Sequence, residues 1–175
     1  MVISKRKIVV IFKQGGLYNM EHKMRRANKQ MTEEAVQKLL EESLYGVLAT
    51  VSEDNEPYAV PMNYVYLENK IYMHGAHEGH KISNMSANEK ACFTIVGKTE
   101  LLAQQFNIAY ESVVAFGTLE IVQDTKEKEK GLMALVEKYS LPFKKEGQEY
   151  IKNAFDKVAV YKFCITNATG KHYVK

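Results

Sequence analysis

The sequence predicts a mainly β fold with peripheral helices, in which about six antiparallel strands form a barrel. Large side chains alternate with smaller or polar ones in "PYAVPMNYVY", residues 57–66. This period of two is typical of a strand. The polar clusters "SEDNE" and "LENK" separate this run from β-type runs on both sides, as in an antiparallel meander. Helical patterns lie between and beside the strands, which favours helices at the periphery of the barrel.

The first predicted helix begins after Thr32, whose hydroxyl can cap the helix, and Glu33 and Glu34 suit its positive first turn. Gly46 interrupts the helical pattern, and the β-type run "VLATV" follows it. With the runs at 57–66 and 71–74, it completes the meander. The apolar face of the helix consists of Ala35, Val36, Leu39, Leu40 and Leu44.

In the second half of the chain, the sequence pattern predicts three strands and three helices. A loop-rich crossing is expected from the end of the fourth strand to about residue 111. The elements in chain order are a short polar helix at 80–88, the buried strand "ACFTIV", the long strand "SVVAFGTLEIV" at 112–122, an amphipathic helix at 124–139, a short helix at 147–155 and the last strand "VAVYKFCI".

The charge distribution divides the 175 residues into a basic N-terminal extension, 1–23, and one domain, 24–175. Residues 1–30 hold eight Lys or Arg and one Glu, a net charge of +7, whereas the remaining residues hold sixteen Lys or Arg and twenty Asp or Glu, a net charge of −4. Proteins that grip nucleic acid usually carry positive charge on the fold itself. We therefore expect no nucleic-acid partner.

The sequence also predicts a cytoplasmic protein that does not insert into membranes. No apolar run approaches the roughly 18 residues that a membrane-spanning helix needs. The early apolar run "IVVIF" is short and flanked by lysines, unlike a secretory signal. Cys92 and Cys164 lie in apolar contexts and are expected to be buried free thiols of an intracellular protein.

The segment "IYMHGAHEGHK", residues 71–81, places His74, His77 and His80 at intervals of three. A zinc site needs three or four converging ligands. Gly75 and Gly79 disfavour the continuous helix that would align the histidines, and no Asp, Glu or Cys stands at a ligand spacing. We therefore predict no metal here and treat His77 as a solvated loop residue.

A phosphate site fits the same segment better. A strand ends at His74, a glycine-containing turn follows, and a helix begins near His80 and Lys81. A strand-to-helix junction points free N–H groups outward at the positive end of the helix dipole, and a lysine adds a cation. Upstream, Pro61 removes a donor from its strand, and the backbone beside it can bond a flat ligand next to Asn63.

Together these motifs resemble the pyridoxamine 5′-phosphate oxidase-like flavoproteins, and within them the nitroimidazole resistance (Nim) group. The resemblance covers roughly residues 24–171. The pieces that carry it are "GVLATV", the P-x-N-Y-V-Y and H-x-A-x-x-G-H-K motifs in "PYAVPMNYVY" and "IYMHGAHEGHKISNM", "ACFTIV" and "ESVVAFGTLEIV".

The resemblance implies a six-stranded antiparallel split β-barrel that forms a homodimer, with two FMN molecules at the subunit interface. Lys81 matches the lysine that contacts the FMN phosphate, and His80 beside it is also expected to bind the cofactor. His74 matches a histidine at the flavin site and is the candidate catalytic residue. The match implies that Val60, Pro61, Met62 and Asn63 line the flavin ring, and that Ser112 approaches the cofactor from the partner subunit.

The function that this resemblance implies is an FMN-dependent oxidoreductase that reduces small aromatic compounds, including nitro compounds. The C-terminal arginine and histidine pattern of true pyridoxamine phosphate oxidases is absent from "NATGKHYVK", so oxidation of vitamin B6 is not expected. Two alternatives remain open. One is a flavin carrier or sensor without turnover, and the other is a barrel of this type that binds haem or a deazaflavin.

Overall fold

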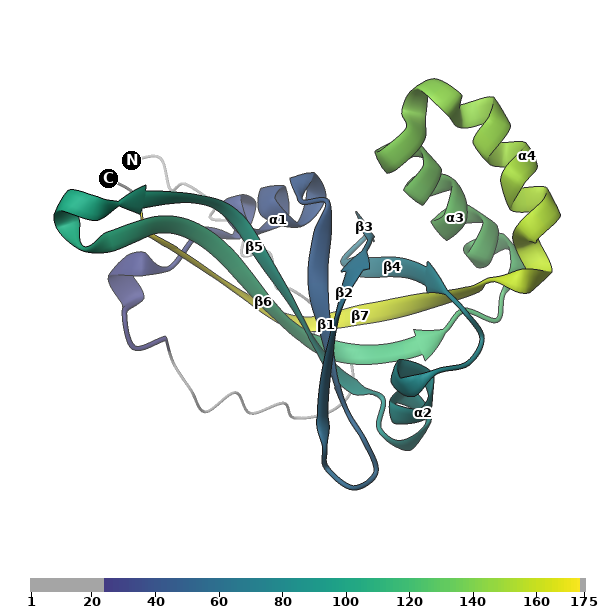
Figure 1. The fold of residues 1–175 in the computed structure, drawn as a ribbon, viewed down its shortest axis with the longest axis horizontal. Helices are drawn as coiled ribbons and strands as arrows, with labels where there is room; N and C mark the ends of the chain where they lie inside the picture. The colour runs from purple at the N-terminus through teal and green to yellow at the C-terminus, as the bar shows by residue number, and fades with distance from the viewer. Residues whose placement is uncertain (1–23, 174–175) are drawn as a thin grey trace, which may run out of the picture.

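The computed structural model describes residues 24–173, which form one antiparallel seven-stranded sheet with helices at its periphery (Figure 1). The strand order is β2-β1-β5-β6-β7-β4-β3. The strands are β1 (Tyr45–Val51), β2 (Pro57–Asn63), β3 (Val65–Leu67), β4 (Lys70–Gly75), β5 (Lys90–Leu102), β6 (Asn107–Ile121) and β7 (Ala159–Tyr173). The helices are α1 (Glu33–Glu42), α2 (His80–Ala87), α3 (Thr125–Ser140) and α4 (Lys144–Ala154), with short 3₁₀ turns η1 (Ala27–Lys29), η2 (Ala103–Gln105), η3 (Leu141–Phe143) and η4 (Phe155–Lys157).

The predicted mainly β fold with peripheral helices is confirmed, but the predicted number of strands is wrong. The expected single strand at 57–66 is two strands, because the chain leaves one edge of the sheet after Asn63 and joins the other edge at Val65. The backbone of Tyr64 bonds to a side chain instead of a neighbouring strand: its N–H donates to the Tyr139 hydroxyl over 3.0 Å. Residues 57–66 therefore contribute strands to both edges of one curved sheet.

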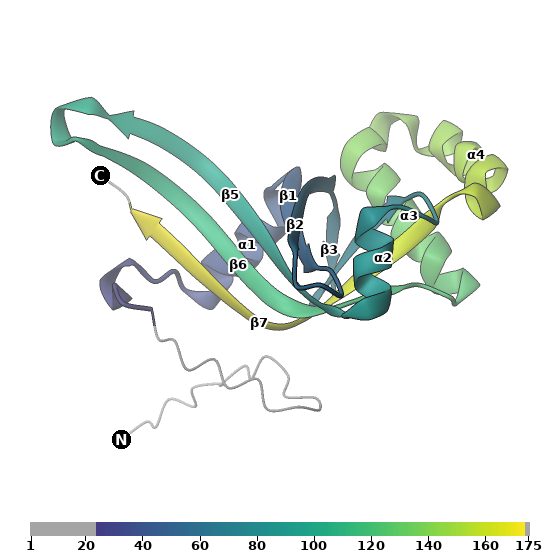
Figure 2. The same ribbon diagram turned by 60° about the horizontal axis from the view of Figure 1, so that its bottom comes forward.

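The loop-rich crossing predicted up to residue 111 is also wrong. β5 and β6 continue past the body of the sheet as a two-stranded arm, joined at its tip by η2 (Figure 2). A register shift between Val96 and Thr99 marks where the arm begins. No helix covers the far end of the arm, so its residues lack the one-sided burial pattern by which strands are predicted from sequence.

The main core fills the curve of the sheet. Its fully buried side chains include Leu48, Phe93 and Phe163, and residues of α1 pack against the same cluster. Thr32 caps α1 as predicted, accepting a hydrogen bond from the Ala35 N–H. A second, smaller core lies under α3 and α4, where Tyr72 and Val160 meet Leu132 and Leu135.

A polar network ties α3 to the sheet. Glu127 accepts a hydrogen bond from the Tyr72 hydroxyl (2.8 Å) and lies 3.0 Å from the Lys162 ammonium, which also contacts Glu120 (2.7 Å). Burial raises the pKa of Glu127, but the hydrogen bonds from Tyr72 and Lys162 outweigh it and lower the pKa overall. The network fixes the helix on β4 and β7.

The basic extension predicted for residues 1–23 lies outside the described residues. Within residues 24–173, no helix is long and apolar enough to cross a bilayer. Cys92 and Cys164 are free, as predicted, but half-buried rather than buried.

Candidate functional site

The N-terminus of α2 is the first component of the candidate site. Gly79 precedes the helix with φ of 122°, a left-handed backbone that a residue with a side chain rarely adopts. Its carbonyl accepts hydrogen bonds from the N–H groups of Ile82 and Ser83. The N–H groups of His80 and Lys81 precede these in the first turn, where N–H groups have no acceptor inside the helix. The predicted junction between strand and helix is present.

Lys81 and His80 each contact an aromatic ring. The Lys81 ammonium lies 5.3 Å from the centre of the Tyr161 ring, and the His80 ring lies 4.1 Å from that of Tyr58. Tyr58 belongs to β2, so this ring pair joins α2 to the strand that carries the other predicted ligands. The ring pair places Tyr58 beside the site.

Two interactions between distant parts of the chain hold the turn and α2 in place. The Tyr161 hydroxyl on β7 donates to the carbonyl of Ala76 in the turn. On the helix, the buried Asn84 amide donates to the buried Thr50 hydroxyl of β1 over 3.0 Å. Sequence reasoning missed all three supporting side chains, because contacts across 34 and 85 positions leave no local pattern.

β2 is an edge strand, as proline in a strand requires, and it presents the predicted residues on two faces. Val60 and Met62 pack against the main core, whereas Pro61 and Asn63 are exposed on the other face. The Asn63 amide donates a weak 3.4 Å hydrogen bond to the Leu44 carbonyl. The outer face of β2 therefore offers a polar side chain beside a backbone edge with no neighbouring strand.

His74 lies at the end of β4, opposite Val160 of β7. Alternate residues of a strand point to opposite faces. Met73 belongs to the main core and Tyr72 to the core under α3, so His74 lies on the α3 side of the sheet. Lys81 lies instead over Tyr161, which is part of the main core. His74 is exposed, and partial desolvation lowers its pKa below the ordinary value, which favours the neutral imidazole.

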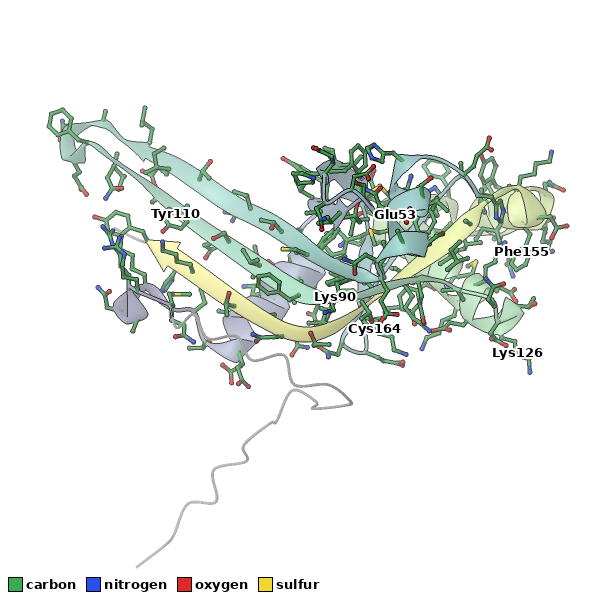
Figure 3. The ribbon with its side chains drawn as sticks, turned by 90° about the horizontal axis from the view of Figure 1, so that it is seen from below. Glu53, Lys90, Tyr110, Lys126, Phe155 and Cys164 are labelled. Atoms are coloured by element: carbon green, nitrogen blue, oxygen red, sulfur yellow. The ribbon has the colours of Figure 1, made fainter. Side chains whose placement is uncertain are left out.

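Ser112 lies apart from the other predicted residues within one chain. It pairs with Val96 of β5 and Lys171 of β7, where the arm begins, and its hydroxyl lies 3.4 Å from the Lys171 carbonyl. β1 and β5 separate β2 from β6, which places the two strands about 14 Å apart at about 4.8 Å per strand. Figure 3 shows the nearby Tyr110 on the arm, at the opposite end of the molecule from Phe155.

Two surface hollows lie along the arm, away from the start of α2. One, of about 450 Å³, is lined by Lys98, Thr99, Tyr110 and Tyr173, among others. The second, of about 380 Å³, lies between the end of α1 and the arm and is lined by Leu44, Tyr45, Val96 and Glu111, among others. Tyr45 pairs with Asn63, the last residue of β2, so the second hollow adjoins this end of the strand, which we call its outer end.

Comparison with known proteins identifies the family to which this fold and these motifs correspond. The family model described as pyridoxamine 5′-phosphate oxidase matches residues 32–172. A search of curated proteins found no match.

Solved structures with the same fold include a candidate 5-nitroimidazole antibiotic resistance protein from Bacteroides thetaiotaomicron. It is 25% identical with a TM-score of 0.71, and the match covers 82% of this chain and 86% of that one. A flavocytochrome from Azotobacter vinelandii (19% identity, TM-score 0.72) is matched over 88% of this chain and 73% of its own. A protein from Mycobacterium smegmatis described as binding FAD and haem (18% identity, TM-score 0.73) is matched over 84% and 74%.

Proposed function

The chain belongs to the pyridoxamine 5′-phosphate oxidase family, and we propose that it binds FMN and uses it to reduce small aromatic compounds, including nitro compounds. The observation that carries the proposal is the start of α2, where helix N–H groups, Lys81 and the ring pair of His80 and Tyr58 lie beside the edge strand β2. The resemblance to the nitroimidazole resistance protein and to the flavin proteins above supports it.

The residues present fit a flat group that carries a phosphate. A helix N-terminus and a lysine ammonium both favour an anion, and charge-assisted hydrogen bonds of this kind contribute about 1.5–3 kcal/mol each. The polar outer face of β2, with Pro61 and Asn63, offers hydrogen-bonding groups to the edge of a ring, and Val60 and Met62 fix that strand on the core. FMN supplies redox chemistry when bound, and the protein supplies position, electrostatics and access.

His74 is the proposed catalytic residue on the strength of the family resemblance, and not of proximity to Lys81, which lies on the other side of the sheet. His74 is exposed at the end of β4, and partial desolvation lowers its pKa, so the neutral imidazole is favoured and orients a ligand through a hydrogen bond. Transfer of a second proton from His74 to a reduced product becomes more frequent as the pH falls. His74→Ala is therefore expected to lower turnover more than cofactor content.

The proposal includes a homodimer in which the second copy completes the site. Within one chain Ser112 lies on a strand about 14 Å from β2 along the sheet, and this separation supports its proposed approach to the cofactor from a partner. The arm exposes apolar side chains that no part of residues 24–173 covers, among them Val96 (60% exposed), Leu101 (73%) and Phe106 (99%). A second copy would bury this surface.

The visible spectrum of the purified protein tests the proposal. We expect a yellow protein that releases FMN on denaturation, bleaches under anaerobic NADH or NADPH, and regains its colour when a nitroaromatic compound is added. A yellow protein that does not bleach would instead be a carrier or sensor. Release of FAD, or a haem absorption band, would assign it to the chemistry of the Mycobacterium smegmatis and Azotobacter vinelandii proteins. A colourless protein that takes up no flavin on reconstitution would contradict the proposal.

A further inference from the structure

The last turn of α3 contacts the point where the chain crosses from one edge of the sheet to the other. Two short segments meet there: residues 43–44, between α1 and β1, and residues 63–64, the last residue of β2 and the single residue that joins it to β3. We call these four residues the crossover. Two consecutive α3 residues, Lys138 and Tyr139, bond to both segments or pack on them.

The Tyr139 hydroxyl ties the two segments of the crossover together. It accepts a hydrogen bond from the Tyr64 N–H (3.0 Å), and its proton is shared between the carbonyl oxygens of Leu44 and Tyr64. The Asn63 amide donates to the same Leu44 carbonyl. One carbonyl therefore links the Tyr139 hydroxyl to the side chain at the end of β2.

Lys138 makes the complementary contact. Its ammonium donates to the Ser43 carbonyl over 2.6 Å and lies 4.1 Å from the centre of the Tyr64 ring. Tyr64 in turn is fully buried and donates its hydroxyl proton to the Leu40 carbonyl of α1. Lys138 therefore contacts both segments of the crossover: the first through the Ser43 carbonyl and the second through the Tyr64 ring.

Within residues 24–173, no carboxylate pairs with Lys138, which is unusual for a half-buried cation. Desolvation lowers its pKa to about 8. The phenols that face it, Tyr64 and Tyr139, have raised pKa values and stay neutral around that pH. The acids of the neighbouring helix turns have other partners: Glu41 with Gln37, Glu42 with Lys38, and Glu137 with Lys144.

We propose that Lys138 and Tyr139 are positioning residues for the flavin site, which hold the crossover so that Asn63 presents its side chain at the outer end of β2. The inference rests on the proposed flavin function. By this inference α3 sets the geometry of β2, the strand proposed to line the flavin ring, although α3 itself carries none of the predicted ligands.

The lysine makes this control sensitive to pH. The folded-state pKa lies below the ordinary lysine value, so the unfolded chain binds the extra proton more tightly between about pH 8 and 10.5. Stability therefore rises with pH across that range. The hydrogen bond from Lys138 to the Ser43 carbonyl, in contrast, weakens as the pH rises, because a neutral amine is a weaker hydrogen-bond donor than an ammonium. Flavin binding should weaken as the pH rises from 7 to 9.

Flavin affinity measured from pH 7 to 9 tests the inference on three variants. We expect Tyr139→Phe and Lys138→Met to weaken flavin binding by about tenfold at pH 7, the factor that one lost hydrogen bond represents. Lys138→Met should also abolish the pH dependence, and Lys138→Arg, which keeps its charge, should bind tightly at every pH. Lys145→Met, on the exposed face of α4, is the matched control and should match the native protein.

Amide hydrogen exchange in the flavin-free protein separates failure of this inference from failure of the proposed function. We expect the Tyr64 amide to exchange faster in Lys138→Met and Tyr139→Phe than in Lys145→Met. If the native protein binds no flavin, the proposed function fails and positioning of the ring fails with it, while faster exchange would show that Lys138 and Tyr139 hold the crossover even so. If flavin binds but neither variant changes affinity, pH profile or exchange, the inference is overturned.

Discussion

Lys81 is the residue to which we assign attraction of an anion at the start of α2. It is half-buried in the first turn of the helix, beside N–H groups that have no acceptor within it. His77 stands four positions earlier in the exposed turn and carries no such geometry. The two side chains are close in sequence and differ in placement, which makes them a matched pair for mutation.

Lys81→Ala is expected to weaken FMN binding about ten- to one-hundredfold, the loss that one charge-assisted bond to a phosphate represents. His77→Ala should leave the affinity unchanged. Titration of the apoprotein with FMN, followed by quenching of flavin fluorescence, measures both. Repeating the titration with riboflavin, which has no phosphate, should show little difference between Lys81→Ala and the native protein. An equal loss from both variants, or from neither, would remove the phosphate role from Lys81.

At the residue scale, the sequence predicted the residues of the strand-to-helix junction, which form a local pattern, and missed the distant side chains that hold this junction in place. The strand-to-helix junction is predicted by a pattern of neighbouring residues, Gly79, His80 and Lys81. Tyr161 and Asn84 secure that junction from other elements, and their roles exist only after β7 and β1 have come together. His74 lies on the α3 side of the sheet, a placement that depends on the register of β4 and β7.

At the scale of elements, α2 depends on one buried polar pair for its orientation against β1. Asn84 and Thr50 are 2% and 3% exposed, and their side chains bond to each other over 3.0 Å. Ile82 and Met85 add apolar contacts on the main core. Apolar contacts resist sliding less than a hydrogen bond with defined geometry, so this pair sets where the helix begins relative to β2.

Asn84→Ala leaves the Thr50 hydroxyl buried without its partner, which should lower the free energy of unfolding by about 1–3 kcal/mol. The double variant Asn84→Leu, Thr50→Val removes both polar groups and should be closer to native stability than the sum of the single changes predicts. Chemical denaturation measures the stabilities. FMN affinity should fall in Asn84→Ala, because the helix start shifts. A destabilised variant with native affinity would show that this pair does not position the phosphate site.

The split of the strand at 57–66 and the arm show why elements were harder to predict than single motifs. Residues 57–66 have a continuous β pattern, and the interruption comes from Tyr139, 75 positions away from Tyr64. The arm has strand geometry without the burial that normally reveals it, since Leu101 and Phe106 are largely exposed. Both features depend on partners that a local pattern does not contain: α3 in one case and, by our proposal, a second chain in the other.

At the scale of the whole molecule, the arm extends from one end and α3 and α4 lie at the other (Figures 1 and 2). At the tip of the arm Phe106 is 99% exposed and adopts a left-handed backbone with φ of 48°. A large aromatic residue in that conformation is unfavourable, and its side chain packs against almost nothing in the described residues 24–173. In a symmetric dimer the same arm is presented twice, so each favourable contact at the interface counts twice.

If the proposed dimer forms through the arm, Phe106→Ser should weaken it without weakening the fold. Burial of a phenylalanine side chain is worth about 1.5–3 kcal/mol, and two copies at one interface should raise the dimer dissociation constant by at least about one-hundredfold. Sedimentation equilibrium measures the constant, and the melting temperature of the monomeric fraction should not change.

Phe143→Ser is the matched control, because Phe143 is also exposed (63%) but lies in η3 at the opposite end of the molecule. Equal dissociation constants for the two variants would place the interface elsewhere. If instead Phe106→Ser alone yields monomers that also lose FMN, the flavin site needs both chains, because Phe106 lies on the arm, distant from Lys81 and β2 of its own copy.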